Sequence, residues 1–229
     1  MVKSGRLERM LRTRPLVRPY IWAHRKNYER AVQTRHAEWL ASDMLFVHVP
    51  KTAGMSISQA LGRPDPGHYL LTDSLEWRRS LGLDSDQLFI FSVVRDPVER
   101  VVSTWNFAYR QDVVNRGIGS ALSLVRSYQT LPNFVSSPTF ATYVEHHYFW
   151  WPQAKYLAGV SSDRIKLLRF DRVDTDAKKL LGLELPTVNA TPGDHRLRAD
   201  ELPQETVDLI RAAYSQDFEL LKKADQQNG

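Results

Sequence analysis

The chain has 229 residues, 42% hydrophobic and 25% charged, which suits one globular domain and leaves too little length for two large ones. It has no cysteine, which excludes disulfides, cysteine-ligated zinc and a thiol nucleophile, and which is compatible with a reducing compartment. The net charge is +5, but residues 1–40 hold ten Lys and Arg against three Glu, and the remainder holds 21 against 23 Asp and Glu. The body of the chain therefore lacks the basic excess expected of a nucleic-acid-binding domain.

The basic segment at residues 1–40 is expected to be a helical N-terminal arm, broken near Pro15 and Pro19. Arg and Lys side chains interrupt every apolar run in it, so it fits neither a secretory signal nor a membrane span. Two interpretations stay open. One is a solvated extension packed through apolar side chains such as Trp39, which we favour; the other is peripheral contact with an anionic glycan or membrane surface. We expect a cytoplasmic protein whose residues 41–229 form a single domain.

Three apolar runs are typical of buried strands, and they lie at residues 44–49, 87–94 and 164–170. Helical spacing follows each of them. The expected helices cover residues 56–61, 98–109, 138–149, 173–181 and 202–223. Strands that alternate with helices predict an α/β fold, here a three-layer P-loop-like domain with a mainly parallel central sheet flanked by helices. Ligands in such folds bind at the carboxyl ends of the strands.

Three stretches between these elements are harder to interpret. Residues 62–85 contain several Gly and Pro, so we expect mostly loop with one helical turn near 74–80. Residues 110–137 are weakly patterned, with a helix expected near 120–128. Residues 183–200 read as a loop because they contain both Pro and Gly.

The first polar motif follows the first strand and reads His48-Val49-Pro50-Lys51-Thr52-Ala53-Gly54-Met55-Ser56. N–H groups at the start of the next helix favour an anion, and Gly54 allows close backbone approach. Lys51 adds a positive charge, and Thr52 and Ser56 add hydroxyl groups. The motif is not a Walker A loop, because Val49 and Pro50 precede the lysine where glycine belongs. The alternative is an ordinary strand-to-helix turn that contains a lysine.

The second polar motif follows the second strand and reads Val94-Arg95-Asp96-Pro97-Val98-Glu99-Arg100-Val101-Val102-Ser103. Arg95 emerges at the edge of the sheet, and Ser103 is expected two turns along the next helix, facing the same edge. A guanidinium and a hydroxyl together suit a terminal phosphate. The alternative is that Arg95 and Asp96 form a helix-capping ion pair while Arg100 lies on the surface.

The order Lys-Thr-Ala-Gly-x-Ser at residues 51–56 resembles the 5′-phosphosulfate loop of sulfotransferases. It is most similar to the carbohydrate sulfotransferase group (sulfotransferase family 2), whose loop reads close to PKTAGTS. Met55 replaces the threonine common there, which removes one hydroxyl but keeps the backbone N–H groups. The RDPxERxxS pattern at residues 95–103 resembles the 3′-phosphate motif of the same family. With weaker matches further along, such as Pro152-Gln153 and Tyr214-x-x-Asp217, the resemblance covers residues 44–220.

This resemblance implies an enzyme, a PAPS-dependent sulfotransferase of the EC 2.8.2 type. PAPS (3′-phosphoadenosine 5′-phosphosulfate) is the implied sulfuryl donor, PAP the product, and a hydroxyl of a carbohydrate or glycolipid the implied acceptor. Lys51 would neutralise charge on the bridging oxygen of the donor during in-line transfer, and no metal is expected. The implied donor-binding residues are Lys51, Thr52, Ala53, Gly54, Met55, Ser56, Arg95 and Ser103.

A base must take the proton of the acceptor hydroxyl. The candidates are nearby carboxylates and five histidines, which are His48, His68, His146, His147 and His195. We choose His68, since related carbohydrate sulfotransferases carry their base at this place in the order of motifs. The alternative is a loop histidine that only hydrogen-bonds the backbone. His48 is expected to be buried and structural. His146 and His147 adjoin an aromatic run that is more typical of a core than of a sugar platform.

Two other functions are consistent with parts of the sequence. A P-loop kinase of small molecules would need a Walker lysine and a carboxylate poised for Mg²⁺. A non-catalytic protein that binds a nucleotide or glycan could use the same scaffold, because fold does not fix function. Retention of Lys51, Ser56, Arg95, Ser103 and a candidate base argues against this second alternative. The identity of the acceptor and the oligomeric state stay open.

Overall fold

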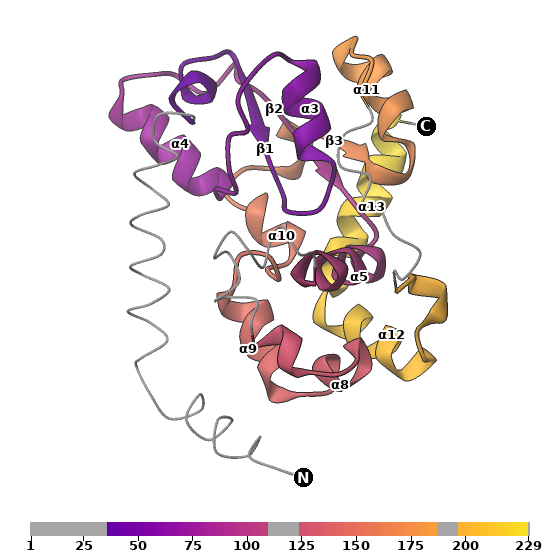
Figure 1. The fold of residues 1–229 in the computed structure, drawn as a ribbon. Helices are drawn as coiled ribbons and strands as arrows, with labels where there is room; N and C mark the ends of the chain where they lie inside the picture. Colours follow the sequence, from indigo (N-terminus) through magenta and orange to yellow (C-terminus); the bar gives the residue numbers. More distant parts are fainter. Residues whose placement is uncertain (1–35, 110–123, 187–196, 229) are drawn as a thin grey trace.

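A computed structural model describes residues 36–109, 124–186 and 197–228, and expectations that concern other residues, including most of the arm, lie outside it. Within the described residues, three parallel strands form one sheet in the order β1-β2-β3 (Figure 1). The strands are β1 (Met44–Val47), β2 (Phe89–Val94) and β3 (Ile165–Arg169). Helices flank this sheet, which confirms the predicted α/β class with a parallel sheet.

The sequence of each strand matches its place in the sheet. The central strand, β2, reads FIFSVV and is buried over its last five residues, as both faces of a parallel sheet require. Its one polar side chain, Ser92, donates a hydrogen bond to the carbonyl of Val47 at 2.7 Å. Strand β3 lies at the edge and exposes Lys166. On its outer side Gln227 accepts from the N–H of Leu167 and donates to the carbonyl of Ile165, both at 3.0 Å.

Two groups of helices surround the sheet (Figure 1). Helices α3 and α4 lie beside β1, whereas α11 and α13 pack on β3. A second apolar cluster, rich in aromatic rings, joins α5, α8, α9 and α12 below the sheet. The helices are α3 (Gly54–Ala60), α4 (Leu71–Ser80), α5 (Pro97–Ala108), α8 (Leu131–Val135), α9 (Pro138–His146), α10 (Gln153–Tyr156), α11 (Val173–Leu181), α12 (Gln204–Ala213) and α13 (Ser215–Asn228).

Some helices differ from the sequence-based expectation. The turn expected near residues 74–80 is the ten-residue helix α4, stabilised by the buried Arg78, which donates to the carbonyls of Leu40, Ser42 and Asp84. Helix α9 ends at His146, three residues before the expected end. The helix expected over 202–223 is two helices, since the chain breaks at Tyr214, whose buried hydroxyl donates to the carbonyl of Trp150 at 2.7 Å.

The end of the predicted arm is packed into the domain. Residues 36–40 are helical, and the fully buried indole of Trp39 donates to the carbonyl of Pro64 at 2.8 Å. His36 is buried too, with its ring 4.5 Å from that of Tyr69 and its Nε2 3.1 Å from the hydroxyl of Ser74. These contacts attach the arm to the loop that leads into α4.

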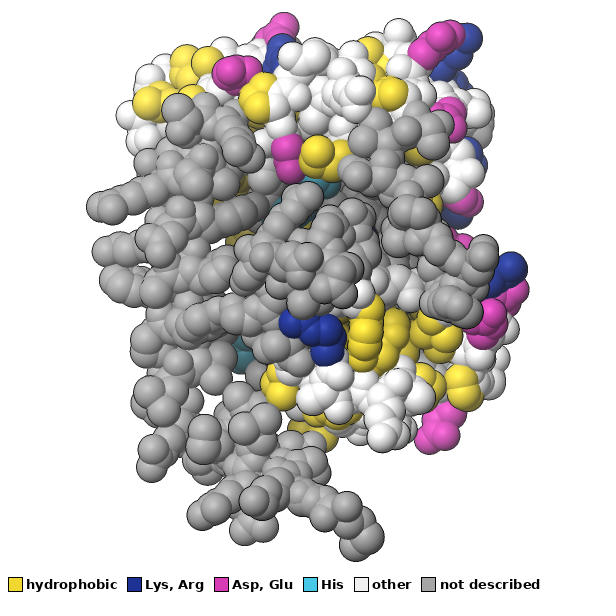
Figure 2. Space-filling model, viewed as in Figure 1, with side chains coloured by type: hydrophobic (Ala, Val, Ile, Leu, Met, Phe, Trp, Pro, Cys, Tyr) yellow, Lys and Arg dark blue, Asp and Glu magenta, His cyan; other side chains and the backbone are white. Residues whose placement is uncertain are grey.

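The described surface carries charges of both signs side by side. Exposed ion pairs join Lys178 to Glu184, Arg198 to Asp200 and Lys222 to Glu219. Figure 2 shows Lys and Arg beside Asp and Glu along the right-hand edge of this face. Among the helices that the structure describes, none combines the length and the apolar character needed to cross a lipid bilayer.

Arg100 on α5 is buried in the aromatic cluster, with 1% of its surface exposed. Its guanidinium donates to the carbonyls of Phe149 and Trp151 and lies 5.4 Å from the ring centroid of Tyr214. The interpretation that placed Arg100 on the surface is therefore wrong. Burial raises the pKa of Asp217, a second fully buried group, and the positive charge of Arg100 opposes part of that effect.

We predict that Arg100→Ala lowers the free energy of unfolding by about 3–5 kcal/mol, because it leaves Asp217 buried without a nearby cation. Urea unfolding monitored by tryptophan fluorescence measures this loss. The control is Arg211→Ala on the exposed side of α12, which should change stability by no more than about 0.5 kcal/mol. Equal losses in the two variants would contradict the role given to Arg100.

Candidate functional site

The first polar motif forms a tight loop between β1 and α3. Lys51 and Ala53 adopt left-handed backbone conformations, with φ of 70° and 66°, which are unfavourable for residues with a side chain. Thr52 between them is fully buried, and its hydroxyl donates to the carbonyl of Val49 at 2.8 Å. The hydroxyl that was predicted to meet a ligand thus also closes the loop on itself. Such strained backbone is typical of ligand-binding loops.

Gly54 begins α3 directly above the ring of His48. A Cβ at Gly54 would lie 2.0 Å from that ring, so a side chain would collide with it. His48 is buried, as predicted, and its ring stacks on Phe46 at 5.5 Å. Its Nδ1 lies 2.6 Å from the Asp65 carboxylate. The glycine that the sequence assigned to close approach of a ligand therefore also allows close packing on His48.

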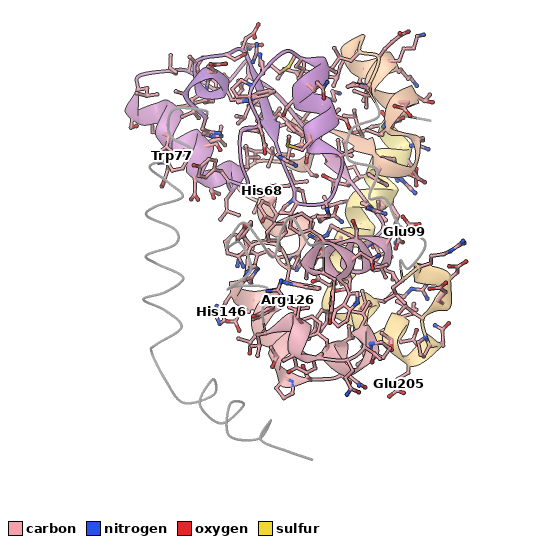
Figure 3. All side chains as sticks on the ribbon, viewed as in Figure 1. His68, Trp77, Glu99, Arg126, His146 and Glu205 are labelled. Carbon is pink, nitrogen blue, oxygen red and sulfur yellow. The ribbon has the colours of Figure 1, made fainter. Side chains whose placement is uncertain are left out.

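His68 lies where the sheet meets the lower helices (Figure 3). Its Nδ1 is 2.9 Å from the backbone carbonyl of His48, and because a carbonyl can only accept, that nitrogen carries the proton. In the neutral ring the lone pair is then on Nε2. The ring lies 4.4 Å from that of His48 and within 6 Å of the rings of Tyr148 and Phe149. The backbone hydrogen bond that the alternative predicts is present, and it is made by Nδ1 of His68.

Burial and the neighbouring groups determine the protonation state of His68. Burial, together with the neighbouring His48, lowers the pKa of His68 from 6.5 to about 3. Burial alone would raise the pKa of Asp65, but its hydrogen bond and charge interaction with His48 outweigh this and hold the pKa well below its usual range. At neutral pH the site therefore contains a neutral His68 beside an ionised Asp65.

The second polar motif turns from β2 into α5. Asp96 caps this helix, accepting from the N–H groups of Val98 and Glu99 at 2.9 and 3.1 Å. Arg95 forms its ion pair with Glu99 at 3.3 Å, one turn further on, and the Asp96 carboxylate is used by the cap. The predicted alternative of an Arg95–Asp96 pair is therefore wrong. The guanidinium of Arg95 also lies 4.0 Å over the ring of Phe170.

The two motifs meet in space. Nη1 of Arg95 donates to the backbone carbonyl of Lys51 at 3.4 Å, and the ammonium of Lys51 lies 4.2 Å over the ring of Phe107 on α5. Ser103 is on the same helix and is half-buried. Two segments some 40 residues apart therefore place two cations at one edge of the sheet.

The other predicted site residues differ in accessibility. Ser56 and Gly54 are buried, Ala53 is half-buried, and Met55 is 45% exposed on the outside of α3. The side chain of Met55 therefore points away from the packed side of the loop. In the described part of the chain, no group of three or more His, Asp or Glu side chains is arranged to hold a metal ion.

Sequence reasoning missed several residues that shape the site. Asp65 holds His48, Phe107 lies under Lys51, and Phe170 lies under Arg95. Gln153 bonds to the main chain of Arg95, and its place in the Pro152-Gln153 match was the only signal. Asp65 has no such signal, since it lies between two prolines in a stretch without periodicity.

Comparison with known proteins gives one match. The family described as "Sulfotransferase family" matches residues 41–224, a range that includes both polar motifs, His68 and helices α3 to α12. No curated protein and no solved structure matches the chain.

We predict that Gly54→Ala destabilises the protein by about 1–3 kcal/mol, because the added methyl must displace the His48 ring. Chemical denaturation measures the loss. The same substitution in a His48→Ala background should cost much less, since the obstructing ring is gone, and this double-mutant cycle is the control. A cost that is the same in both backgrounds would contradict the packing explanation.

Stability should fall as the solution becomes acidic. Burial lowers the pKa of His36 to about 4 and that of His68 to about 3, whereas both titrate near 6.5 when unfolded. From pH 6.5 down to about 4 the unfolded chain binds more protons, so the free energy of unfolding decreases by up to about 1.4 kcal/mol per pH unit for each histidine. Urea unfolding across this range measures the slope. His36→Gln and His68→Gln should each reduce it, and an unchanged slope in both would contradict the prediction.

Proposed function

The chain belongs to the sulfotransferase family, and on that premise we propose that it moves the sulfuryl group of PAPS to a hydroxyl of a carbohydrate or glycolipid. Membership supports sulfuryl transfer in general, while donor, acceptor and base belong to the proposal. The observation that carries it is the 3.4 Å contact between Arg95 and the backbone of Lys51. It brings together two anion-binding motifs that resemble the two ends of one nucleotide-binding site.

The residues present suit a nucleotide with a phosphate at each end. Lys51, Thr52 and Ser56 lie on the loop after β1, and Arg95 and Ser103 lie after β2. Among the described residues, Arg95 forms its ion pair with Glu99, whose carboxylate is half exposed to solvent, so an incoming phosphate can replace that carboxylate. The ammonium of Lys51 lies over the ring of Phe107.

His68 is proposed as the base, and its surroundings suit that role. The bond from Nδ1 to the carbonyl of His48 fixes the tautomer, so Nε2 is the atom that receives the proton of the acceptor hydroxyl. The ring is neutral at pH 7 and ready to accept. A pKa near 3 makes a weak base in the free protein, but an anion bound beside the ring would raise that pKa toward neutrality.

Lys51 is proposed to stabilise the charge that develops on the oxygen between the sulfuryl group and the 5′-phosphate. Bound PAPS supplies the activated sulfuryl group, and PAP is the leaving nucleotide. The protein contributes positive charge at the leaving side and a proton acceptor at the attacking side, which is what in-line transfer needs. The strained loop at residues 51–53 holds the backbone of Lys51 in place before the ligand arrives.

We predict that Lys51→Ala and Arg95→Ala each lower sulfate transfer by about 100-fold or more, since each removes a cation that stabilises the donor or its leaving group. His68→Ala should lower kcat by about 100-fold and leave affinity for PAP nearly unchanged, since a base acts on the acceptor. Transfer is measured by mass spectrometry with PAPS and a panel of glycan and glycolipid acceptors, and affinity by calorimetry with PAP.

Each part of the proposal can fail separately. A wild-type protein that does not bind PAP would end the claim about the donor. Normal turnover by His68→Ala would show that the base is another group. PAP binding without turnover on any acceptor would favour a binding protein, and Mg²⁺-dependent phosphorylation with ATP would favour a kinase. The cytoplasmic location and a surface contact through the arm stay predictions from the sequence.

A further inference from the structure

The main chain of Arg95 lies just beyond the end of the sheet. The register of β2 with β3 ends at the pair Val94 and Arg169, so Arg95 has no strand partner in that register. The side chain of Gln153 supplies the missing partner. Its Oε1 accepts from the N–H of Arg95 at 2.9 Å, and its Nε2 donates to the carbonyl of Arg95 at 2.8 Å. One side-chain amide therefore satisfies both backbone groups, in place of a further rung of the sheet.

Gln153 is itself held by Asp217 on α13. One carboxylate oxygen accepts from the backbone N–H of Gln153 at 2.9 Å and from its Nε2 at 3.2 Å. The other oxygen accepts from the N–H of Ala154 at 2.9 Å. Gln153 and Asp217 are both fully buried, so their bonds are shielded from water, and any rearrangement would leave buried polar groups unpaired.

The side-chain contacts of Arg95 are weaker than the two hydrogen bonds that Gln153 makes to its backbone. Its guanidinium lies against the Phe170 ring, pairs with the half-exposed Glu99 and donates to Lys51 at 3.4 Å. None of these contacts is short or fully enclosed, so together they leave the guanidinium able to shift. The direction in which it leaves the sheet is set by the backbone that Gln153 holds.

We propose that Gln153, oriented by Asp217, is a positioning residue that aims Arg95 at the 3′-phosphate of the nucleotide. The inference rests on the proposed function and deepens it. Gln153 acts through Arg95 and does not touch the nucleotide. It joins α10 and α13 to the end of β2, so two helices far along the chain take part in selecting the donor.

The test compares two probes, adenosine 3′,5′-bisphosphate (PAP) and adenosine 5′-monophosphate, by calorimetry. The ratio of their affinities reports the hold on the 3′-phosphate. Gln153→Met keeps the size of the side chain and removes its hydrogen bonds, and it should weaken PAP binding by about tenfold with little effect on the monophosphate. In an Arg95→Ala background the same substitution should have little further effect on the ratio, because the two residues act in series.

The matched control is Gln227→Met. The Gln227 amide also bonds one N–H and one carbonyl of a strand, those of Leu167 and Ile165, but near the opposite end of β3. It should cost stability and leave the affinity ratio unchanged. Asp217→Asn is the second variant, since it replaces one acceptor of Gln153 by a donor, and it should lower the ratio as well. If Gln153→Met does not fold, the Asp217→Asn variant still tests the proposal.

The outcomes distinguish failure of the proposed donor site from failure of the positioning role of Gln153. A wild-type protein that binds PAP no better than the monophosphate would end the proposed donor site and the positioning role together. A wild-type protein that prefers PAP, with Gln153→Met and Asp217→Asn keeping that preference while losing stability, would overturn the positioning role alone. Loss of the preference in these variants, with Gln227→Met unaffected, is the expected result.

Discussion

The parallel pairing of β1 with β2 is the constraint on which the site depends. Parallel strands end at the same edge of a sheet, so the loops that follow Val47 and Val94 must emerge side by side. Their neighbourhood brings the guanidinium of Arg95 to the backbone of Lys51. Burial of the apolar strands drives this pairing, and the buried hydrogen bond from Ser92 to the carbonyl of Val47 supports it. The sheet therefore decides that the two loops lie next to each other.

Much of the fold follows from local signals in the sequence. The three apolar runs predicted the strands, because a buried parallel strand must be apolar on both faces. Helix α11 was predicted with its observed bounds, and in the structure Gly182 ends it in a left-handed conformation. The two polar motifs were found because each has a fixed order of residue types next to a strand. Signals of this kind extend over a few neighbouring residues, so they can be recognised without knowledge of contacts that are distant in sequence.

The rest could not be predicted, because it depends on pairs that are distant in sequence. Arg95 and Gln153 are 58 residues apart, and Gln153 and Asp217 are 64 apart, so no periodicity reports their contact. At the break between α12 and α13, the hydroxyl of Tyr214 bonds to the carbonyl of Trp150, again 64 residues away. The Asp65 carboxylate that holds His48 lies in a loop without a pattern. In each case tertiary contacts decide the local structure.

The amide of Gln227 has a consequence for the synthesis of the protein. It covers backbone groups of β3 that would otherwise present an open edge to other chains. Helix α13 is the last described element, so β3 leaves the ribosome some 60 residues before the side chain that shields it. During that interval the exposed edge of β3 can associate with other chains. This ends when α13 docks on β3 and Gln227 bonds its backbone groups.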